Sequence, residues 1–143
     1  MIPPGTITAS ATHAAERLPF LFDGDRGSRC LTGGPQSGTE AIRLELATPR
    51  DVAAVRIQMG SRSFGDYPRD LSIEATEDNG SRVLYRGTVL PQFARGLLND
   101  AEYPYIDIVL PPNRTRVLHL RQLGTTHGFF WSIHELQLLE RLP

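Results

Sequence analysis

Leu21-Phe22-Asp23-Gly24-Asp25-Arg26-Gly27-Ser28-Arg29-Cys30-Leu31-Thr32 is a polar loop set between apolar residues. Its two glycines let the backbone turn through angles that a residue with a Cβ atom resists. Asp23, Asp25 and Ser28 supply oxygen atoms of the hard kind that Ca²⁺ takes as ligands. Two interpretations are open at this point: a solvated Asp-Gly turn between two elements, or a loop that folds around a cation.

The composition is that of a single globular domain covering residues 1–143. The chain has 143 residues, 40% of them hydrophobic and 22% charged, and its net charge is −1. A chain this long can bury a self-sufficient core. The charge balance gives no reason to expect nucleic-acid binding. Cys30 is the single cysteine, so no internal disulfide can form, and its thiol is interpreted as a small half-buried hydrophobe.

Alternation of apolar and polar residues predicts many short strands. Ile42, Leu44 and Leu46 alternate with polar neighbours, which is the period-two pattern of a half-buried strand. Similar patterns give about eight strands, over residues 6–11, 39–46, 52–59, 71–76, 83–85, 105–110, 116–121 and 131–140. Asn79-Gly80 predicts a hairpin turn over residues 77–80. Residues 88–103 are expected to form an irregular excursion, with a helix over 88–99 as the alternative. The pattern favours a β-sandwich or small barrel.

Several motifs together resemble the discoidin, or coagulation factor 5/8 C-type, domain of the galactose-binding-like superfamily. They are Asp23-Gly24-Asp25, Thr32-Gly33-Gly34-Pro35-Gln36, the strand ending at Leu46, Tyr67-Pro68-Arg69-Asp70-Leu71 and Trp131-Ser132-Ile133-His134-Glu135-Leu136. The resemblance runs almost end to end and implies an all-β fold, an antiparallel β-sandwich of jelly-roll type. The Thr-Gly-x-Pro-Gln variant is similar to discoidin-type domains attached to bacterial membrane glycosyltransferases and carbohydrate-active enzymes.

The same resemblance implies a structural Ca²⁺ where the first loop meets the last strand. Its oxygen ligands would come from six residues: Phe20, Asp23, Asp25, Ser28, His134 and Glu135. Such an ion would join the two ends of the sheet across more than 100 residues and offset a loop-closure entropy. Where the family usually has an aromatic residue, this chain has Cys30, so the packing beside the loop differs from the family pattern.

Three loops carry side chains suited to a sugar, for which an aromatic ring stacks on the apolar face and polar groups fix the hydroxyls. The candidates are Arg62, Phe64, Asp66 and Tyr67 in the first loop, Gln92, Phe93, Arg95 and Asn99 in the second, and His127, Phe129 and Phe130 in the third. Phe64 and Phe129 are predicted to be exposed at loop tips beside glycines. Trp131 is expected in the core, and His134 on an exposed strand face.

The sequence reveals no set of residues that would form a catalytic site. The histidines, at positions 13, 119, 127 and 134, lack zinc-site spacing, and no Gly-rich phosphate loop opens a helix. We therefore expect a non-catalytic carbohydrate-binding module that targets or supports a larger extracytoplasmic or membrane enzyme. Its partners would be a carbohydrate and the parent enzyme domains of the same polypeptide. The alternative is a structural or protein-interaction module that packs against its parent enzyme without a sugar.

Two further expectations concern location and lipid. Residues 1–5 lack the basic and apolar regions of a signal peptide, so a periplasmic, cell-surface or secreted location would depend on a longer protein. Phospholipid binding, known from the coagulation-factor relatives, is disfavoured because the chain has no lysine and its net charge is slightly negative.

Overall fold

A computed structural model describes residues 1–77 and 80–141 of the protein. The strands are β1 (Ile7–Ala11), β2 (Cys30–Leu31), β3 (Glu40–Arg50), β4 (Val52–Gln58), β5 (Leu71–Glu77), β6 (Gly80–Gly87), β7 (Tyr105–Val109), β8 (Thr115–Gln122), β9 (Ser132–Ile133) and β10 (Glu135–Glu140). The described residues also form one α-helix, α1 (Leu90–Asn99), and three 3₁₀-helices, η1 (Pro4–Thr6), η2 (Ala15–Leu21) and η3 (Ser61–Asp66).

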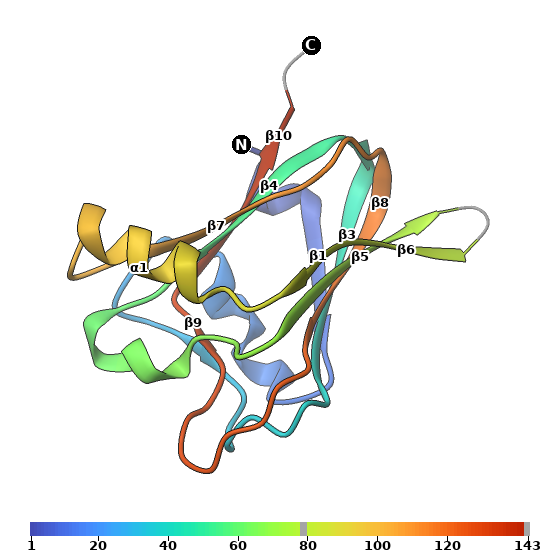
Figure 1. The fold of residues 1–143 in the computed structure, drawn as a ribbon. Helices are drawn as coiled ribbons and strands as arrows, with labels where there is room; N and C mark the ends of the chain where they lie inside the picture. The colour runs from blue at the N-terminus through green and yellow to red at the C-terminus, as the bar shows by residue number, and fades with distance from the viewer. Residues whose placement is uncertain (78–79, 142–143) are drawn as a thin grey trace.

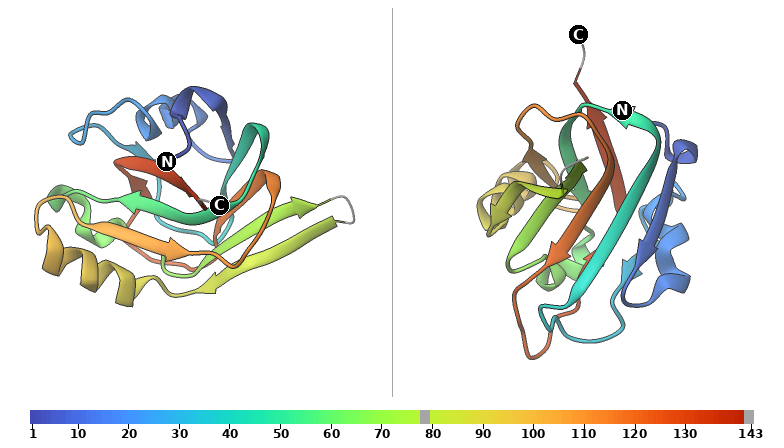
Figure 2. Two further views of the ribbon diagram at one scale, coloured as in Figure 1. Left: turned by 90° about the horizontal axis from the view of Figure 1, so that it is seen from above. Right: turned by 90° about the vertical axis from the view of Figure 1, so that its right-hand side faces the viewer.

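The strands form two main sheets that face one another (Figures 1 and 2). A five-stranded sheet has the order β1-β3-β8-β5-β6, and a three-stranded sheet has the order β10-β4-β7. Strands β2 and β9 make a third, short pair. Every pairing in these sheets is antiparallel. The predicted antiparallel β-sandwich is therefore confirmed, and the two-residue strands β2 and β9 raise the strand number above the expected eight.

The period-two pattern of the sequence places the core between the two sheets. In β3 the side chains of Ile42, Leu44 and Leu46 are buried while their neighbours are not. On the adjacent strand β8, Leu120 lies opposite Ile42 and Leu118 opposite Leu44. Each such side chain stabilises the fold by about 1.5–3 kcal/mol when it is removed from water. The three-stranded sheet contributes the matching buried side chains Val55, Ile57, Ile106, Ile108, Leu136 and Leu138.

The segment after β6 is helical, and this corrects the expected irregular excursion. Helix α1 begins beside Pro91, which fits the first turn because its missing N–H would have no partner there. Phe93 and Gly96 are buried against the sandwich. A Cβ atom on Gly96 would lie 2.1 Å from the carbonyl oxygen of Tyr105, so the helix packs in close contact with β7. Phe93, a candidate sugar contact in the sequence, is a core residue with 5% exposure.

Two further expectations differ in detail from the structure. The closing segment, expected as one strand over residues 131–140, is divided at His134 into β9 and β10. The predicted turn over residues 77–80 includes 78–79, which lie outside the described residues. On either side of them, Glu77 at the end of β5 pairs with Gly80 at the start of β6. Among the described residues, no helix is both long and apolar enough to cross a bilayer.

Candidate functional site

An exposed aromatic ring marks the end of the sandwich where η3 meets the loop of residues 123–131. Phe129 is 48% exposed, and its ring occupies the space beside Gly65, where an added Cβ would lie 2.1 Å from Phe129 Cε1. The Thr126 hydroxyl donates to the Phe129 carbonyl at 2.9 Å and accepts from the Phe129 N–H at 3.0 Å. The ring is thus held in place on a fixed backbone and still faces solvent.

Arg69 joins this ring to the core-facing aromatics. Its guanidinium carbon lies 3.8 Å from the ring centroid of Tyr67 and 5.2 Å from that of Phe129. The same group donates a hydrogen bond of 2.8 Å to the Gly65 carbonyl. A cation over an aromatic face contributes about 0.5–2 kcal/mol. The sequence indicated a structural Arg69 paired with a carboxylate; in the structure its partners are instead two aromatic rings and the Gly65 carbonyl, through which it helps to connect the two loops.

Buried Gln36 fixes the two loops relative to each other. Its amide nitrogen donates to the Tyr67 carbonyl at 3.0 Å and to the Phe130 carbonyl at 2.8 Å. Its amide oxygen accepts from the Arg69 N–H at 3.1 Å. Sequence reasoning missed this role, although the motif Thr32-Gly33-Gly34-Pro35-Gln36 contained the signal. A buried amide with three backbone partners is a rigid support for the loop end.

The other first-loop candidates are supports of the site. Asp66 accepts a 2.6 Å hydrogen bond from Ser132 and lies 3.6 Å from the Arg29 guanidinium. Phe64 is half-buried and its ring meets that of Phe93 edge-on at 5.9 Å. The expectation of an exposed Phe64 at a loop tip is therefore wrong, because Phe93 of α1 offers it an apolar partner. Tyr67 is also half-buried and stacks on Phe93 at 5.3 Å.

The remaining ligand candidates lie in three different places. His127 is exposed in the same loop as Phe129. Arg62 lines a separate pocket together with Arg26. Arg95 lines a groove between α1 and β7, together with Asp107 and other residues. The structure therefore brings Asp66, Tyr67, His127 and Phe129 to one end of the sandwich and leaves Arg62 and Arg95 on other surfaces.

The two ends of the chain meet at the acidic loop, as the resemblance implied. The Gly24 N–H donates a 2.7 Å hydrogen bond to Glu135 Oε1 across 111 residues of sequence. Within the loop, Asp23 accepts from the Asp25 N–H at 2.9 Å and from the Ser28 hydroxyl at 2.7 Å. The expected contact between the early aspartates and the late glutamate is therefore present.

At this junction the pKa values of Asp23 and Glu135 are shifted in opposite directions. Burial raises the pKa of Glu135, and the nearby Asp23 carboxylate raises it further. Hydrogen bonds from the Ser28 hydroxyl and the Asp25 N–H lower the pKa of Asp23. The donor set is all oxygen, which suits Ca²⁺. Over residues 1–77 and 80–141, no group of three or more His, Cys, Asp or Glu side chains could hold a metal ion. Hydroxyl and carbonyl oxygens would have to complete the shell, and the contributions of Phe20 and His134 stay predictions.

His134 is buried beside this junction, which corrects the expectation of an exposed side chain. Its Nδ1 lies 2.7 Å from the Arg26 carbonyl and its Nε2 lies 2.7 Å from the Ser63 hydroxyl. Because a carbonyl can only accept, Nδ1 carries the proton. A neutral ring then accepts at Nε2 from the Ser63 hydroxyl, whose other possible acceptor is the Gly60 carbonyl at 3.1 Å. The ring occupies the space of a Cβ at Gly60, only 2.5 Å away. Burial lowers the pKa of His134, which favours the neutral ring.

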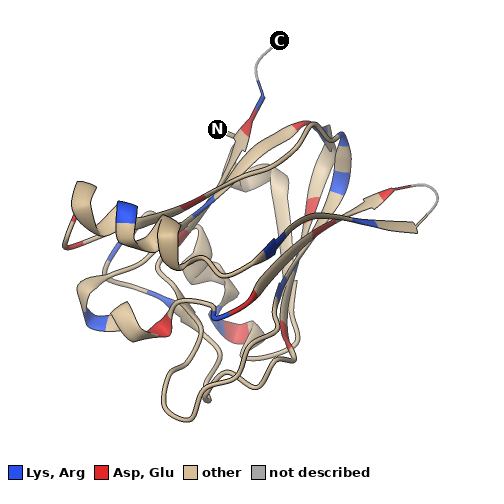
Figure 3. Cartoon of the chain, viewed as in Figure 1, with Lys and Arg blue, Asp and Glu red and all other residues tan. Residues whose placement is uncertain are grey.

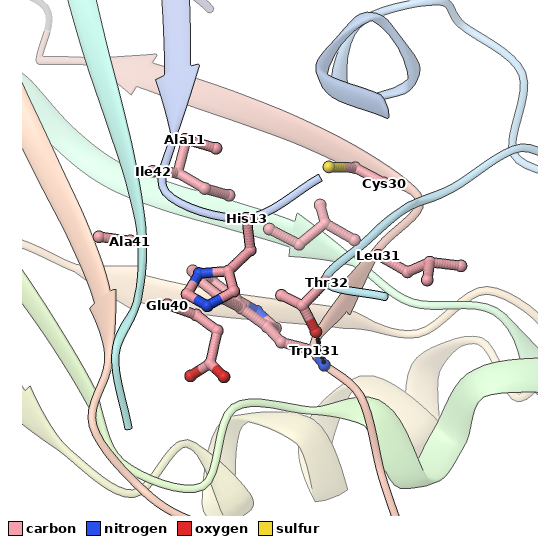
Figure 4. A pocket seen from close by; sticks show the side chains of 10 residues that line it. Ala11, His13, Cys30, Leu31, Thr32, Glu40, Ala41, Ile42 and Trp131 are labelled. Atoms are coloured by element: carbon pink, nitrogen blue, oxygen red, sulfur yellow. Dashed lines mark hydrogen bonds between the residues drawn. The ribbon is translucent and has the colours of Figure 1, made fainter. Parts of the chain in front are cut away.

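The single cysteine, Cys30, is one of the residues that line a narrow cavity between β1, β2, β3 and Trp131 (Figure 4). The free volume of this cavity is only about 10 Å³, close to what one water molecule needs. Cys30 is 7% exposed, and burial raises the pKa of its thiol to about 11. The thiol is therefore uncharged at neutral pH, which agrees with its interpretation as a small hydrophobe. Trp131 is 2% exposed and is a core residue, as expected.

The fold is that of discoidin-like family 32 carbohydrate-binding modules. A module from a family 31 glycoside hydrolase of Clostridium perfringens aligns with a TM-score of 0.74 and 19% identity, over 97% of this chain and 94% of its own. The family 32 module of C. perfringens NanJ, solved with galactose, gives 0.71 and 19% over 96% of both chains. The module of Streptococcus pneumoniae EndoD gives 0.70 and 14%, over 98% of this chain and 99% of its own. No family model and no curated protein matches the sequence.

Proposed function

We propose that this chain is a non-catalytic carbohydrate-binding module whose sugar contact is the loop end around Phe129. The observation that carries the proposal is the half-exposed Phe129 ring, fixed by Gly65, Arg69 and Thr126. A sugar ring stacks its apolar C–H face on such a surface, and the site gains affinity because the ring is already ordered before binding. His127, exposed in the same loop, is a candidate for a hydroxyl contact.

The fold neighbours support the carbohydrate class. The NanJ module was solved with galactose, and a C. perfringens GH89 module with the same fold was solved with GalNAc-β-1,3-galactose. At 19% and 18% identity these similarities support the fold alone. The choice of sugar depends on the loops of this chain. We therefore propose a sugar as the ligand and leave its identity to a glycan array.

The experiment compares binding by the wild type and Phe129→Ala. An array identifies a bound glycan, and calorimetry then measures its affinity for both proteins. We expect Phe129→Ala to weaken binding at least tenfold, or about 1.4 kcal/mol, with an unchanged melting temperature. Val83→Ala is the control, because Val83 is 56% exposed on strand β6. Equal affinity of Phe129→Ala and wild type would refute the site, and a lack of binding to every glycan would refute the class.

The proposed role in a longer protein is to hold an extracytoplasmic enzyme near its glycan. The structure of C. perfringens ZmpB, which contains two family 32 modules and an M60 catalytic domain, matches 98% of this chain over 15% of its own length. That arrangement supports a module within a larger enzyme. A parent protein that carries Phe129→Ala should keep its activity on small soluble substrates and lose retention on a glycan surface.

The proposal includes a structural Ca²⁺ at the junction of the first loop and β10. Asp23 and Glu135 would supply carboxylate oxygens, and Ser28 and loop carbonyls would supply the rest. The support is the approach of exposed Asp23 to buried Glu135, whose pKa the Asp23 carboxylate raises. A bound cation would relieve that repulsion and neutralise Glu135. Its role would be to stabilise the contact between the two ends of the chain.

A further inference from the structure

A second polar pocket lies on another side of η3, away from the Phe129 ring. Its volume is about 270 Å³, and three chain segments converge on it: the acidic loop, the start of η3 and the connection from α1 to β7. Arg26, Ser61, Arg62, Glu102 and Tyr103 line it, and buried His134 forms part of its wall. At this size, just below the range for drug-sized ligands, the pocket suits a single ring.

The charged groups of this pocket are available to a ligand. In the part of the chain that the structure describes, none of Arg26, Arg62 and Glu102 takes part in an ion pair. The Arg26 guanidinium is positioned by other means: it donates to the Tyr105 hydroxyl at 3.2 Å and lies 5.5 Å from the Tyr103 ring centroid. One arginine is thus oriented by two tyrosines, and the second is exposed at the rim.

The acidic residues of the neighbouring loop are already engaged with their own turn. Asp25 Oδ1 accepts from the Gly27 N–H at 2.8 Å, and Asp23 accepts from Ser28 and from the Asp25 N–H. Among the residues that line the pocket, two are arginines and one is a glutamate. Figure 3 shows basic and acidic residues interspersed over the strands and loops of the molecule.

We propose that this pocket binds an acidic monosaccharide unit, a pyranose that carries one carboxylate. Arg26 and Arg62 receive the carboxylate, because guanidinium groups match its geometry and charge. Glu102 and the Ser61 hydroxyl accept and donate to the ring hydroxyls. This site is separate from the one at Phe129. The inference rests on the proposed function only in taking the ligand to be a sugar.

The test follows backbone amide shifts by NMR while free galacturonate, galactose or acetate is added to the ¹⁵N-labelled domain. We expect galacturonate to shift amides at Arg26–Gly27, Gly60–Arg62 and Glu102–Tyr103. Galactose and acetate should bind this pocket at least tenfold more weakly, because galactose lacks the carboxylate and acetate lacks the ring hydroxyls. Added NaCl should weaken galacturonate binding, since the carboxylate contact is exposed to salt.

Variants separate the arginine contact from a general charge effect. Arg62→Ala should reduce galacturonate affinity at least tenfold, while Arg114→Ala, at an exposed arginine outside the pocket, should not change it. Galacturonate shifts confined to the loop of residues 123–131 would overturn the inference and leave the Phe129 site intact. Equal binding of acetate and galacturonate would overturn the sugar assignment. Shifts at the pocket alone, with no sugar at Phe129, would support the inference and count against the proposed loop-end site.

Discussion

At the scale of single residues, the loop end depends on positions that a sequence pattern does not single out. Phe129 could be predicted as an exposed aromatic because a glycine precedes it. Its partner Gly65 and the bridging Arg69 could not, because their roles arise from contacts between segments far apart in the sequence. Phe64 also has a glycine beside it and yet packs inside. The difference is Phe93, whose position depended on a helix that the sequence only weakly indicated.

Gly65→Ala should disturb the proposed sugar site without changing any polar group. An added Cβ would lie 2.1 Å from the Phe129 ring, so the ring must leave its place and its ordered orientation is lost. We expect glycan affinity to fall at least tenfold, measured by calorimetry with the sugar that the array identifies. Gly128→Ala is the matched control, because nothing lies within 4 Å of its added Cβ. Equal losses in both variants would argue against a fixed ring.

The buried ring of His134 predicts a stability that falls with acid. Burial lowers its pKa below the ordinary 6.5, so the unfolded chain takes up a proton at a higher pH than the folded chain does. The stabilising contribution is present above 6.5 and is lost as the pH falls from there through the folded-state pKa. NMR titration should show the His134 ring titrating below 6.5. A ring that titrates at or above that value would contradict the neutral form inferred from its hydrogen bonds.

At the scale of elements, the strands were predicted outright, whereas the helix was predicted only as the alternative over residues 88–99. Period-two alternation depends on residues within one segment, so β3, β5, β7 and β8 could be located from the sequence alone. The sequence indicated helix α1 only weakly because its contact face includes Gly96, which has no apolar side chain to mark the helical period. The division of the last strand at His134 could not be predicted for a related reason. The His134 side chain is buried against Arg26 and Ser63, which are distant from it in the sequence.

Gly96→Ala tests the close packing of α1 on β7. Helix propensity alone would favour alanine by about 1 kcal/mol. The added Cβ, however, would lie 2.1 Å from the Tyr105 carbonyl oxygen, and overpacking of this kind costs about 1–3 kcal/mol. We therefore expect a net loss of stability in urea unfolding.

The exposed position Ala94 in the same helix provides the control. Ala94→Gly should cost about 1 kcal/mol through propensity alone. If Gly96→Ala instead stabilised the protein, the helix would not be packed against β7 as the structure has it.

At the scale of the whole molecule, the fold closes where the first loop contacts the last strand. The sequence motifs around Asp23 and Glu135 predicted this contact through their resemblance to discoidin domains, and the hydrogen bond from Gly24 to Glu135 confirms it. The occupant of the junction could not be predicted in the same way. A proton on Glu135 and a bound Ca²⁺ would both neutralise the same carboxylate, and the choice depends on free energies that a motif does not contain.

Without a cation, the junction should become less stable as the pH rises. The pKa of Glu135 is raised above 4.5 in the folded state, so its contribution is complete below 4.5 and is lost as the pH rises through the folded-state pKa. Ca²⁺ should restore that stability at neutral pH, by about 2.7 kcal/mol at one hundred times its dissociation constant. Melting of the wild type with Ca²⁺ and with a chelator at pH 7 measures the effect.

Glu135→Gln separates the two possible occupants. The amide oxygen of glutamine can still accept from the Gly24 N–H, but it carries no charge. With chelator at pH 7 this variant should therefore melt at or above the wild-type temperature, and it should no longer respond to Ca²⁺. Glu16→Gln, at an exposed position in η2, should respond as the wild type does. If the wild type melts at one temperature with and without Ca²⁺ while Glu135→Gln melts higher, no Ca²⁺ binds at the junction and Glu135 is charged at pH 7, because only relief of that charge then distinguishes the two proteins.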